Sequence, residues 1–332
     1  MKYSETLGID VSKRTLDAYL HQGNKHSQFS NDTKGFKSML AWLRTYCEPS
    51  QCLICFEFTG DYSVPLSRFL TEEKLAFTMI PGLEIKLSTG LKRGKDDVTD
   101  AKRIAEYCWL RRDSLQPSKI LSNQLFKLQK LLNVRDYCVQ QEVSLGQQKQ
   151  EFLAVFKKSE NPEMIKMIDG LLRKCLKTKK EVEKLINELI KGDDELNRLY
   201  ALMTSVVGIG PVIAWNMLVL TNGFNRFTSS RQFACFAGVA PFPHRSGTSL
   251  NSKDRVSHMA NKHMKSLLNL GARSAILADP ELKAYYHRKI EEGKNKMNVL
   301  NAVRNKLIHR VFSVVRRGTP YVRLNAISIN VK

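Results

Sequence analysis

The 332-residue chain predicts an α/β N-terminal domain, a helical coiled-coil middle and a mainly α C-terminal domain. Three observations support this fold class. Short apolar strands alternate with amphipathic helices over the first third, and a seven-residue apolar repeat runs through the middle. Two apolar helices joined by glycines open the last third. The predicted domains are residues 1–117, 118–194 and 195–332.

The first third is predicted to form a mixed sheet with flanking helices. Two strands on either side of a short polar turn read as a hairpin, and a candidate third strand follows. A helix after a capping threonine, a buried strand that ends at Gly60, a second helix and another strand come next. The predicted ranges are 6–12, 15–21 and 25–31 for the first strands, then 33–47, 52–60, 63–73 and 75–81.

The middle carries heptad spacing over two helices, broken near residues 159–164. Gln141 and Gln148 interrupt the first apolar seam, so the second seam predicts helix pairing more strongly. The segment is therefore either a helical hairpin or an intermolecular coiled coil. The seam positions are Leu131, Cys138, Leu145 and Phe152, then Ile168, Cys175, Val182 and Leu189, with Leu171 and Leu185 at d-like positions.

The last third begins with two apolar helices joined by Gly208-Ile209-Gly210, which resembles a helix-hairpin-helix element. In such a turn the glycines let backbone N–H groups approach a phosphate, although a tight helix connection without a ligand uses the same residues. A basic helical tail ends the chain.

The bulk composition predicts a polyanionic partner. The chain has 53 Lys and Arg against 32 Asp and Glu, a net charge of +21, and each neutralised phosphate releases counterions. No stretch approaches the roughly 18 apolar residues that span a bilayer, so no membrane is expected. Seven scattered cysteines favour a reducing cytoplasm. A strand would point Cys52 and Cys55 to opposite faces, which predicts core thiols rather than a zinc site.

Acidic residues mark a candidate metal site. Asp10 ends the first apolar strand, and Glu57 lies in another, where a carboxylate is costly to bury. Asp97 and Asp100 share a helix face, as do Asp96 and Asp100, so spacing alone does not select the pair. Aspartates also suit a first helical turn without any metal. Together, however, such carboxylates suit Mg²⁺ or Mn²⁺, and two such ions can clamp the oxygens of a phosphoryl transfer.

These motifs resemble a known family. Gly8-Ile9-Asp10-Val11-Ser12-Lys13, then Glu57, then Lys95-Asp96-Asp97-Val98-Thr99-Asp100-Ala101 resemble the DEDD transposases of bacterial insertion sequences and the related Piv DNA invertases. The resemblance implies a RuvC-like, RNase H-type N-terminal fold. Its register implies a tetrad of Asp10, Glu57, Asp97 and Asp100.

The resemblance continues in the last third. Residues 233–241, Phe-Ala-Cys-Phe-Ala-Gly-Val-Ala-Pro, are followed by Ser246-Gly247. In that family this serine attacks a DNA phosphate and forms a covalent link, so the resemblance implies Ser246 as the nucleophile. A serine hydroxyl needs a base, metal or positive field to become reactive. Without the family context Ser246 would read as part of a turn, with Ser249 and Ser252 as neighbouring rivals.

The resemblance implies a DNA recombinase that mobilises an insertion sequence. Its implied partners are donor and target DNA, a structured bridge RNA that pairs with both, and further copies of the chain in a dimer or tetramer. Alternatives are a metal-dependent nuclease such as a junction resolvase, which needs only the tetrad, and a non-catalytic nucleic-acid-binding protein. An actin-like sugar kinase is disfavoured, because Lys13 and Arg14 follow Asp10 where a phosphate loop needs small residues.

Overall fold

The computed structural model describes residues 3–89, 96–157, 160–246, 250–256 and 259–322. The chain divides into two compact units, unit 1 of residues 1–120 and unit 2 of residues 121–332. The three-part division at residues 117 and 194 stays a prediction.

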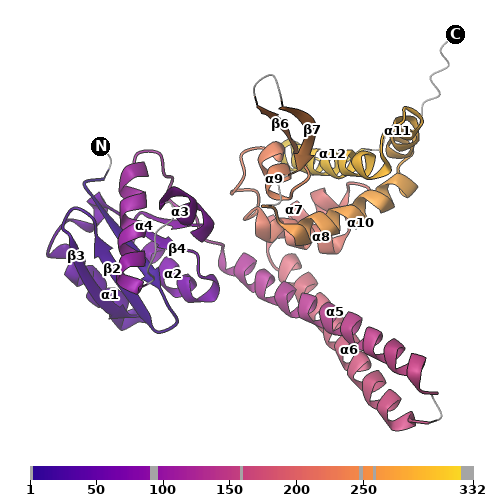
Figure 1. Ribbon diagram of the computed structural model, residues 1–332, viewed down its shortest axis with the longest axis horizontal. Coiled ribbons are helices and arrows are strands. Elements are labelled where there is room, and N and C mark those ends of the chain that lie inside the picture. The colour runs from indigo at the N-terminus through magenta and orange to yellow at the C-terminus, as the bar shows by residue number, and fades with distance from the viewer. Residues whose placement is uncertain (1–2, 90–95, 158–159, 247–249, 257–258, 323–332) are drawn as a thin grey trace. The chain divides into compact units, whose positions relative to one another are not determined.

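Unit 1 contains a five-stranded mixed sheet in the order β3-β2-β1-β4-β5 (Figure 1). β1 pairs antiparallel with β2, and β2 with β3, whereas β1–β4 and β4–β5 are parallel. The predicted hairpin, third strand and mixed sheet are therefore confirmed. The strands are β1 (Glu5–Val11), β2 (Thr15–Leu20), β3 (Lys25–Ser30), β4 (Cys52–Glu57) and β5 (Phe77–Ile80).

The two faces of this sheet bury different helices, because side chains alternate along each strand. Leu7, Ile9 and Ile54 lie on the face covered by α1 (Thr33–Arg44) and α2 (Val64–Glu72). Leu53 and Cys55 lie on the face covered by α3 (Gly82–Thr89) and α4 (Asp97–Arg111). Two short 3-10 turns, η1 (Pro49–Gln51) and η2 (Gly60–Ser63), flank β4.

The cysteines of the C-x-x-C segment follow the same alternation. Cys52 packs with the first of these clusters and Cys55 with the second, and both side chains are fully buried as free thiols. The prediction of core thiols on opposite faces of a strand is confirmed.

Unit 2 begins with two long helices, α5 (Asn123–Val155) and α6 (Pro162–Lys191), which run side by side (Figure 1). Interhelix ion pairs join Arg135 to Glu183 at 2.8 Å and Glu142 to Lys179 at 2.6 Å. As the residue number rises on α5 it falls on α6, so the two helices are antiparallel within one chain.

The helical seam differs in detail from the predicted heptad. Val182 is buried, as expected, but Leu171 and Leu185 are 52% and 49% exposed. Instead, the buried residues of α6 include Ile165 and Ile186. Each lies three residues before a predicted seam position, Ile168 or Leu189. The sequence could not show which row is buried, because apolar residues lie both three residues after the predicted seam positions, as Leu171 and Leu185 do, and three residues before them.

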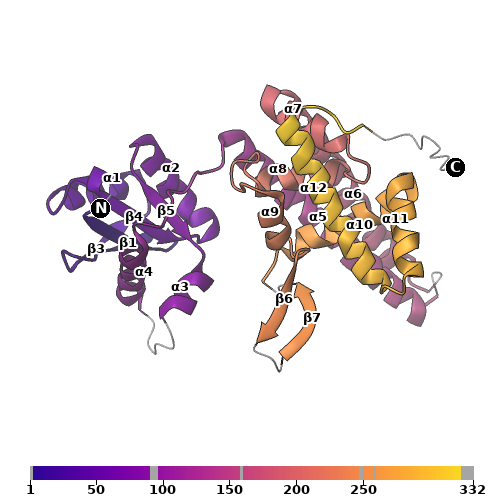
Figure 2. The ribbon, with the colours of Figure 1, turned by 90° about the horizontal axis from the view of Figure 1, so that it is seen from above.

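The rest of unit 2 is mainly helical, as predicted, with one exception. A two-stranded antiparallel sheet of β6 and β7 projects from the helices (Figure 2), where no strands were predicted. The remaining elements are α7 (Asp194–Thr204), α8 (Pro211–Leu220), α9 (Ser230–Phe236), β6 (Pro241–Ser246), β7 (Leu250–Val256), α10 (Lys262–Ala278), α11 (Pro280–Glu291) and α12 (Lys296–Arg317). Within the described ranges, no helix is both long and apolar enough to cross a membrane.

The glycines between α7 and α8 are explained partly by packing. Gly208 has a φ of +93°, and a Cβ there would lie 2.6 Å from the carbonyl oxygen of Gly271 in α10. This close crossing of backbones requires glycine at both positions. Gly210 has no such neighbour and precedes α8 as its N-cap residue. A phosphate-binding role for this turn stays a prediction.

Candidate active site

Asp10 and Glu57 lie at the carboxyl ends of two adjacent parallel strands. Ile9 of β1 is the register partner of Phe56 of β4, and Asp10 and Glu57 are the next residues along each strand. Both are half-buried. Because Gly8 pairs with Cys55 on the α4 face, Asp10 and Glu57, two residues further on, are directed to that face too. The fold therefore brings these two predicted acids to one edge of the sheet.

Asp97 and Asp100 occupy the first turn of α4, and the packing of that helix sets their direction. Asp97 is one turn before Ala101 and Asp100 one turn before Ile104, both of which are buried against the sheet. Side chains four residues apart lie on the same helix face. The two aspartates therefore lie on the helix face that packs on the sheet, at its N-terminal end before the buried apolar residues begin.

A glycine allows α4 to lie directly on β1. A Cβ on Gly8 would stand 2.3 Å from the carbonyl oxygen of Ala101 and 2.3 Å from the backbone nitrogen of Ala105. The Thr6 hydroxyl donates a 3.0 Å hydrogen bond to the Ala105 carbonyl, which also holds the two elements together. This contact between small residues places the start of α4 beside the end of β1.

Asp96 has a different role in the structure. It is the N-cap residue of α4, and its carboxylate accepts hydrogen bonds from the backbone N–H of Thr99, at 2.9 Å, and from the Thr99 hydroxyl. These hydrogen bonds lower the pKa of Asp96 below its ordinary value. The spacing of the aspartates left open whether Asp96 or Asp97 pairs with Asp100. Asp96 is occupied in capping the helix.

Acidic neighbours and burial perturb Asp10 strongly. Burial contributes most and the negative charges of Asp97 and Asp100 come next, followed by those of Asp17 and Glu57, which together raise the pKa of Asp10 to about 6. Both effects disfavour the ionised form, because burial removes water from the carboxylate and the neighbouring carboxylates repel its charge. Asp10 is thus the electrostatic centre of the acidic group.

Asp17 belongs to this group, although it was not predicted. It lies in β2, is the direct register partner of Asp10 and is only 3% exposed. His26 Nε2 lies 3.0 Å from its Oδ1, and the Gln28 side-chain amide donates to both of its oxygens at 3.2 and 3.1 Å. The sequence signal was available, since positions 10 and 17 are symmetric about the turn at Lys13 and Arg14.

Glu57 and Asp100 are each held by a local contact. The Glu57 carboxyl group lies over Gly82, the first residue of α3, where an added Cβ would stand 1.9 Å from Oε1. Asp100 accepts a 2.8 Å ion pair from Arg103 one turn further along α4. Arg103 therefore places a positive charge beside the acidic group, and Gly82 leaves space for the Glu57 carboxylate.

The chemistry of this group fits a divalent cation. Carboxylate oxygens are the ligands that Mg²⁺ and Mn²⁺ prefer, and a positive ion would offset both the burial of the Asp10 charge and its repulsion by the neighbouring acids. Within the described residues, no three His, Cys, Asp or Glu side chains form a ready metal-binding group. Asp10, Glu57, Asp97 and Asp100 would therefore have to rotate inward to share one ion.

Ser246 is the last residue of β6, and its backbone pairs with Leu250 of β7. The rival Ser252 lies in β7, opposite His244. Gly247 and the other rival, Ser249, lie outside the described residues, as does Lys95 of the acidic motif. The predicted nucleophile therefore stands at the end of a hairpin strand in unit 2.

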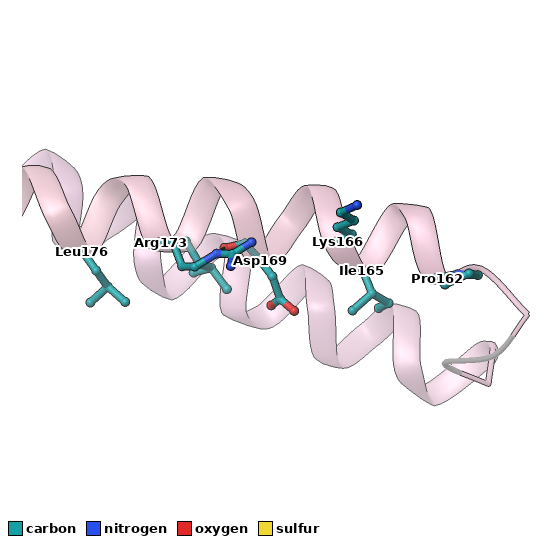
Figure 3. Close-up of a pocket in the computed structure, with 7 residues that line it drawn as sticks. Pro162, Ile165, Lys166, Asp169, Arg173 and Leu176 are labelled. Atoms are coloured by element: carbon teal, nitrogen blue, oxygen red, sulfur yellow. Dashed lines mark hydrogen bonds between the residues drawn. The ribbon is translucent and has the colours of Figure 1, made fainter.

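A cavity of about 490 Å³ lies along α6 and contains none of the predicted site residues. Figure 3 shows the side chains that line it, among them the apolar Ile165 and Leu176 and the positively charged Lys166 and Arg173. Asp169, which also lines the cavity, accepts an ion pair at 2.6 Å from Lys149 of α5. This cavity is a feature of the helical hairpin and is distinct from the acidic group.

Comparisons with known proteins show which class of enzyme the chain belongs to. Residues 7–157, which include the whole acidic group, match a family model described as "Transposase". The enzyme class is therefore that of DNA recombinases and transposases. Residues 200–287, which include Ser246, match a second model, described as "Transposase IS116/IS110/IS902 family". The chain belongs to this transposase family, and the predicted resemblance is confirmed.

Individual relatives agree with this assignment. The chain is similar to the pilin gene-inverting protein of Moraxella bovis, with 26% identity over 322 residues, covering 95% of the chain and 97% of that protein. It is also similar to an uncharacterized 43.6 kDa protein of insertion element IS110 from Streptomyces coelicolor, with 29% identity over 143 residues. That match covers 43% of the chain and 34% of the relative.

Proposed function

We propose that this transposase cuts and rejoins donor and target DNA of an insertion sequence through a covalent serine–DNA intermediate. The observation that carries the proposal is the gathering of carboxylates from β2, β4 and α4 around the half-buried Asp10 of β1, where burial and these charges raise the pKa of Asp10 to about 6. Such crowding is typical of sites that bind a metal or transfer a proton. A metal-dependent phosphoryl transfer accounts for it.

The proposed metal ligands are Asp10, Glu57, Asp97 and Asp100. A bound Mg²⁺ or Mn²⁺ would polarise a phosphate oxygen and stabilise the charge that develops on the leaving oxygen. The packing of Gly8 against α4 positions the two helix aspartates, and Asp96 fixes the first turn through its cap. Asp17, held by His26 and Gln28, adds negative charge behind Asp10 and acts as a positioning residue.

The proposed nucleophile is Ser246. Its Oγ attacks a DNA phosphorus, the Oγ–P bond forms, and the bond from phosphorus to the leaving sugar oxygen breaks. The hydroxyl proton passes to a base, and the leaving oxygen takes up a proton. The phosphodiester energy is kept in the serine ester, so a second sugar hydroxyl can reverse the step and rejoin the strands without ATP.

The proposed assembly is a dimer or tetramer that carries a structured bridge RNA. Family resemblance suggests both features, and the net charge of +21 suits a subunit that binds RNA and DNA together. In this arrangement base pairing selects the sites while the protein contacts backbone and shape. The name of the Moraxella relative extends the proposed range of outcomes to DNA inversion.

The test is capture of DNA on the protein. Purified protein is incubated with the flanking transcript of its element, labelled donor and target DNA, and Mg²⁺ or EDTA, and is then run on denaturing gels. We expect a covalent adduct that requires Mg²⁺ and disappears in Ser246→Ala, whereas the matched variant Ser252→Ala retains it. Omission of the RNA should abolish recombination.

One observation favours a second candidate, a metal-dependent nuclease or junction resolvase. All the acids of the group lie within unit 1, so their chemistry does not itself require a serine. Such an enzyme would cleave DNA normally as Ser246→Ala and would never form an adduct. An adduct of unchanged yield in Ser246→Ala would instead show that another residue is the nucleophile.

A further inference from the structure

Unit 2 contains a buried arginine on the core side of α12. Arg304 is 5% exposed and lies one turn after Leu300 and one turn before Ile308, both of which are buried. An arginine in an apolar stripe is unusual, because a buried charge is costly unless it is paired. The groups around Arg304 therefore decide whether its charge is compensated.

The hydrogen-bond partners of Arg304 are neutral. Its Nη1 donates to the side-chain oxygen of Asn301 at 3.2 Å, and its Nη2 to that of Asn269 in α10 at 2.5 Å. Its Nε is buried without a hydrogen-bond partner. In the part of the chain that the structure describes, no carboxylate lies within ion-pair distance of this guanidinium.

Arg310, six residues further along the same helix, shows the contrast. Its guanidinium binds Asp279 at 2.5 Å and Glu281 at 2.7 Å, so two carboxylates neutralise it. Arg304 is the more buried of the two, yet it receives only amide oxygens. A purely structural arginine would be expected to have the surroundings of Arg310.

A second cation lies beside Arg304. Lys265 is half-buried on α10, one turn before Asn269, and α10 packs against α12 (Figures 1 and 2). Burial lowers the pKa of Lys265, and the positive charge of Arg304 lowers it further. Burial also lowers the pKa of Arg304. Two positive groups thus repel each other in a partly desolvated place, and a bound anion would relieve both.

The position of this pair links it to the proposed chemistry. The side-chain amide of Asn301 donates a 2.7 Å hydrogen bond to the carbonyl oxygen of Val239. Val239 is two residues before β6, the strand that ends at Ser246. Asn301 therefore connects the helix that carries Arg304 to the segment that leads to the predicted nucleophile.

We infer that Arg304 and Lys265, with the amides of Asn269 and Asn301, form a binding site for a phosphate group of a nucleic-acid backbone. Arginine binds phosphate in a bidentate manner through Nε and a neighbouring Nη, and in Arg304 the Nε is the donor left without a hydrogen-bond partner. Lys265 supplies a second charge at the more exposed side of the cluster. The site rests on the proposed function only for the source of the phosphate, in DNA or in RNA.

The test compares Arg304→Gln with Lys306→Gln, which removes one charge from the same helix. Binding of labelled donor DNA, target DNA and flanking RNA is measured separately by fluorescence anisotropy over a range of salt. We expect Arg304→Gln to lose at least about tenfold in affinity and to reduce the slope of log K against log salt by about one. Lys306→Gln should lose less than about threefold. Which nucleic acid is weakened identifies the source of the phosphate.

A second measurement covers the case in which Arg304→Gln folds poorly. Lys265→Gln leaves the hydrogen bonds of Arg304 in place and should show the same loss of affinity and of salt slope. Inorganic phosphate should raise the Tm of the wild-type chain and have a smaller effect on Lys265→Gln. Wild-type affinity and salt slope in Arg304→Gln, or in Lys265→Gln if the former is unfolded, would overturn the inference.

The same assay separates this inference from the proposed function. Ser246→Ala should bind nucleic acid with the affinity and salt slope of the wild type while losing the covalent adduct. An adduct that persists in Ser246→Ala refutes the nucleophile and leaves the phosphate site standing. Unchanged binding in Arg304→Gln refutes the phosphate site and leaves the nucleophile standing.

Discussion

Asp10 of β1 and Asp17 of β2 are direct cross-strand partners, so two carboxylates stand side by side on the α4 face of the sheet. Like charges directly opposite each other destabilise a strand pair. The charge of Asp17 contributes to the raised pKa of Asp10, and its own oxygens are held by His26 and Gln28. The pair is therefore a fixed source of electrostatic strain at the proposed metal site.

Replacing Asp17 by Asn should lower the pKa of Asp10, because one of the negative charges that raise it is removed. The acid limb of the pH–rate profile for DNA capture should then move to lower pH. The shift should be less than about 1 unit, since burial, Asp97 and Asp100 contribute more. Asp113→Asn, an exposed acid of unit 1, is the control and should leave the profile in place. A shift to higher pH in Asp17→Asn would contradict the assignment.

Replacing Asp10 by Asn should stabilise the metal-free protein at alkaline pH. The pKa of Asp10 in the folded protein is about 6, above its ordinary value of 3.8. The folded state is therefore favoured while the carboxyl is protonated, below about pH 4, and loses that stability as the pH rises through about 6. The gain in Asp10→Asn is at most about 3 kcal/mol, reduced by solvent around a half-buried group.

This expectation is checked by thermal unfolding in EDTA at pH 4 and pH 8. The Tm of Asp10→Asn should exceed that of the wild type by several degrees at pH 8 and converge with it at pH 4. Mg²⁺ should raise the Tm of the wild type and have little effect on the variant. A variant that is less stable than the wild type at pH 8 would argue against electrostatic strain at Asp10.

Replacing Gly8 by Ala should separate α4 from β1. The new methyl group would stand 2.3 Å from backbone atoms of α4, so the helix must move, at a cost of about 1–3 kcal/mol. Metal-dependent DNA capture should fall because Asp97 and Asp100 move with the helix. Gly170→Ala is the control: it lies within α6 with open space around it and should stabilise the chain by about 0.5–1 kcal/mol. Full activity in Gly8→Ala would exclude the close contact as the positioning device.

Substitutions at Asp96 should distinguish capping from metal binding. Asp96→Ala removes the N-cap and should cost about 1 kcal/mol, whereas Asp96→Asn keeps a good capping residue and should retain both stability and Mg²⁺-dependent capture. Asp97→Asn should lose capture with little change in Tm. If Asp96→Asn is as inactive as Asp97→Asn, then Asp96 belongs to the metal ligands.

Much of unit 1 and its acidic group was predictable from the sequence. Short apolar runs defined the strands that carry Asp10 and Glu57 near their carboxyl ends, and the periodic stripe behind Asp97 and Asp100 defined the helix. The symmetry of Asp10 and Asp17 about the predicted turn indicates that they pair, but a single acid in a strand next to a turn resembles an ordinary surface residue, so Asp17 was missed. Its burial depends on His26 and Gln28, which come from a strand whose pairing must first be known.

The parts that escaped prediction depend on three-dimensional partners. Arg304 lies in a tail rich in lysine and arginine, and only the packing of α12 on α10 shows that this one cation is buried among amides. The β6–β7 hairpin escaped because its strands carry charged residues rather than an alternating apolar pattern. In the helical hairpin, Leu171 and Leu172 both fit an apolar repeat, and only the partner helix decides between them.

The charged rungs between α5 and α6 also determine how the hairpin is aligned. If one helix slid by a heptad, Arg135 would face Ile190 or Leu176 instead of Glu183, leaving a cation against an apolar side chain. Among shifts by whole heptads, only the observed alignment keeps Arg135, Glu142 and Lys149 all opposite residues of the other sign. The 30 residues of α6 then form a strut, a helix of about 45 Å at 1.5 Å per residue, and the ion pairs keep it from sliding along α5. Whatever binds at the far end of that strut is held at a constant spacing from the helices at its base.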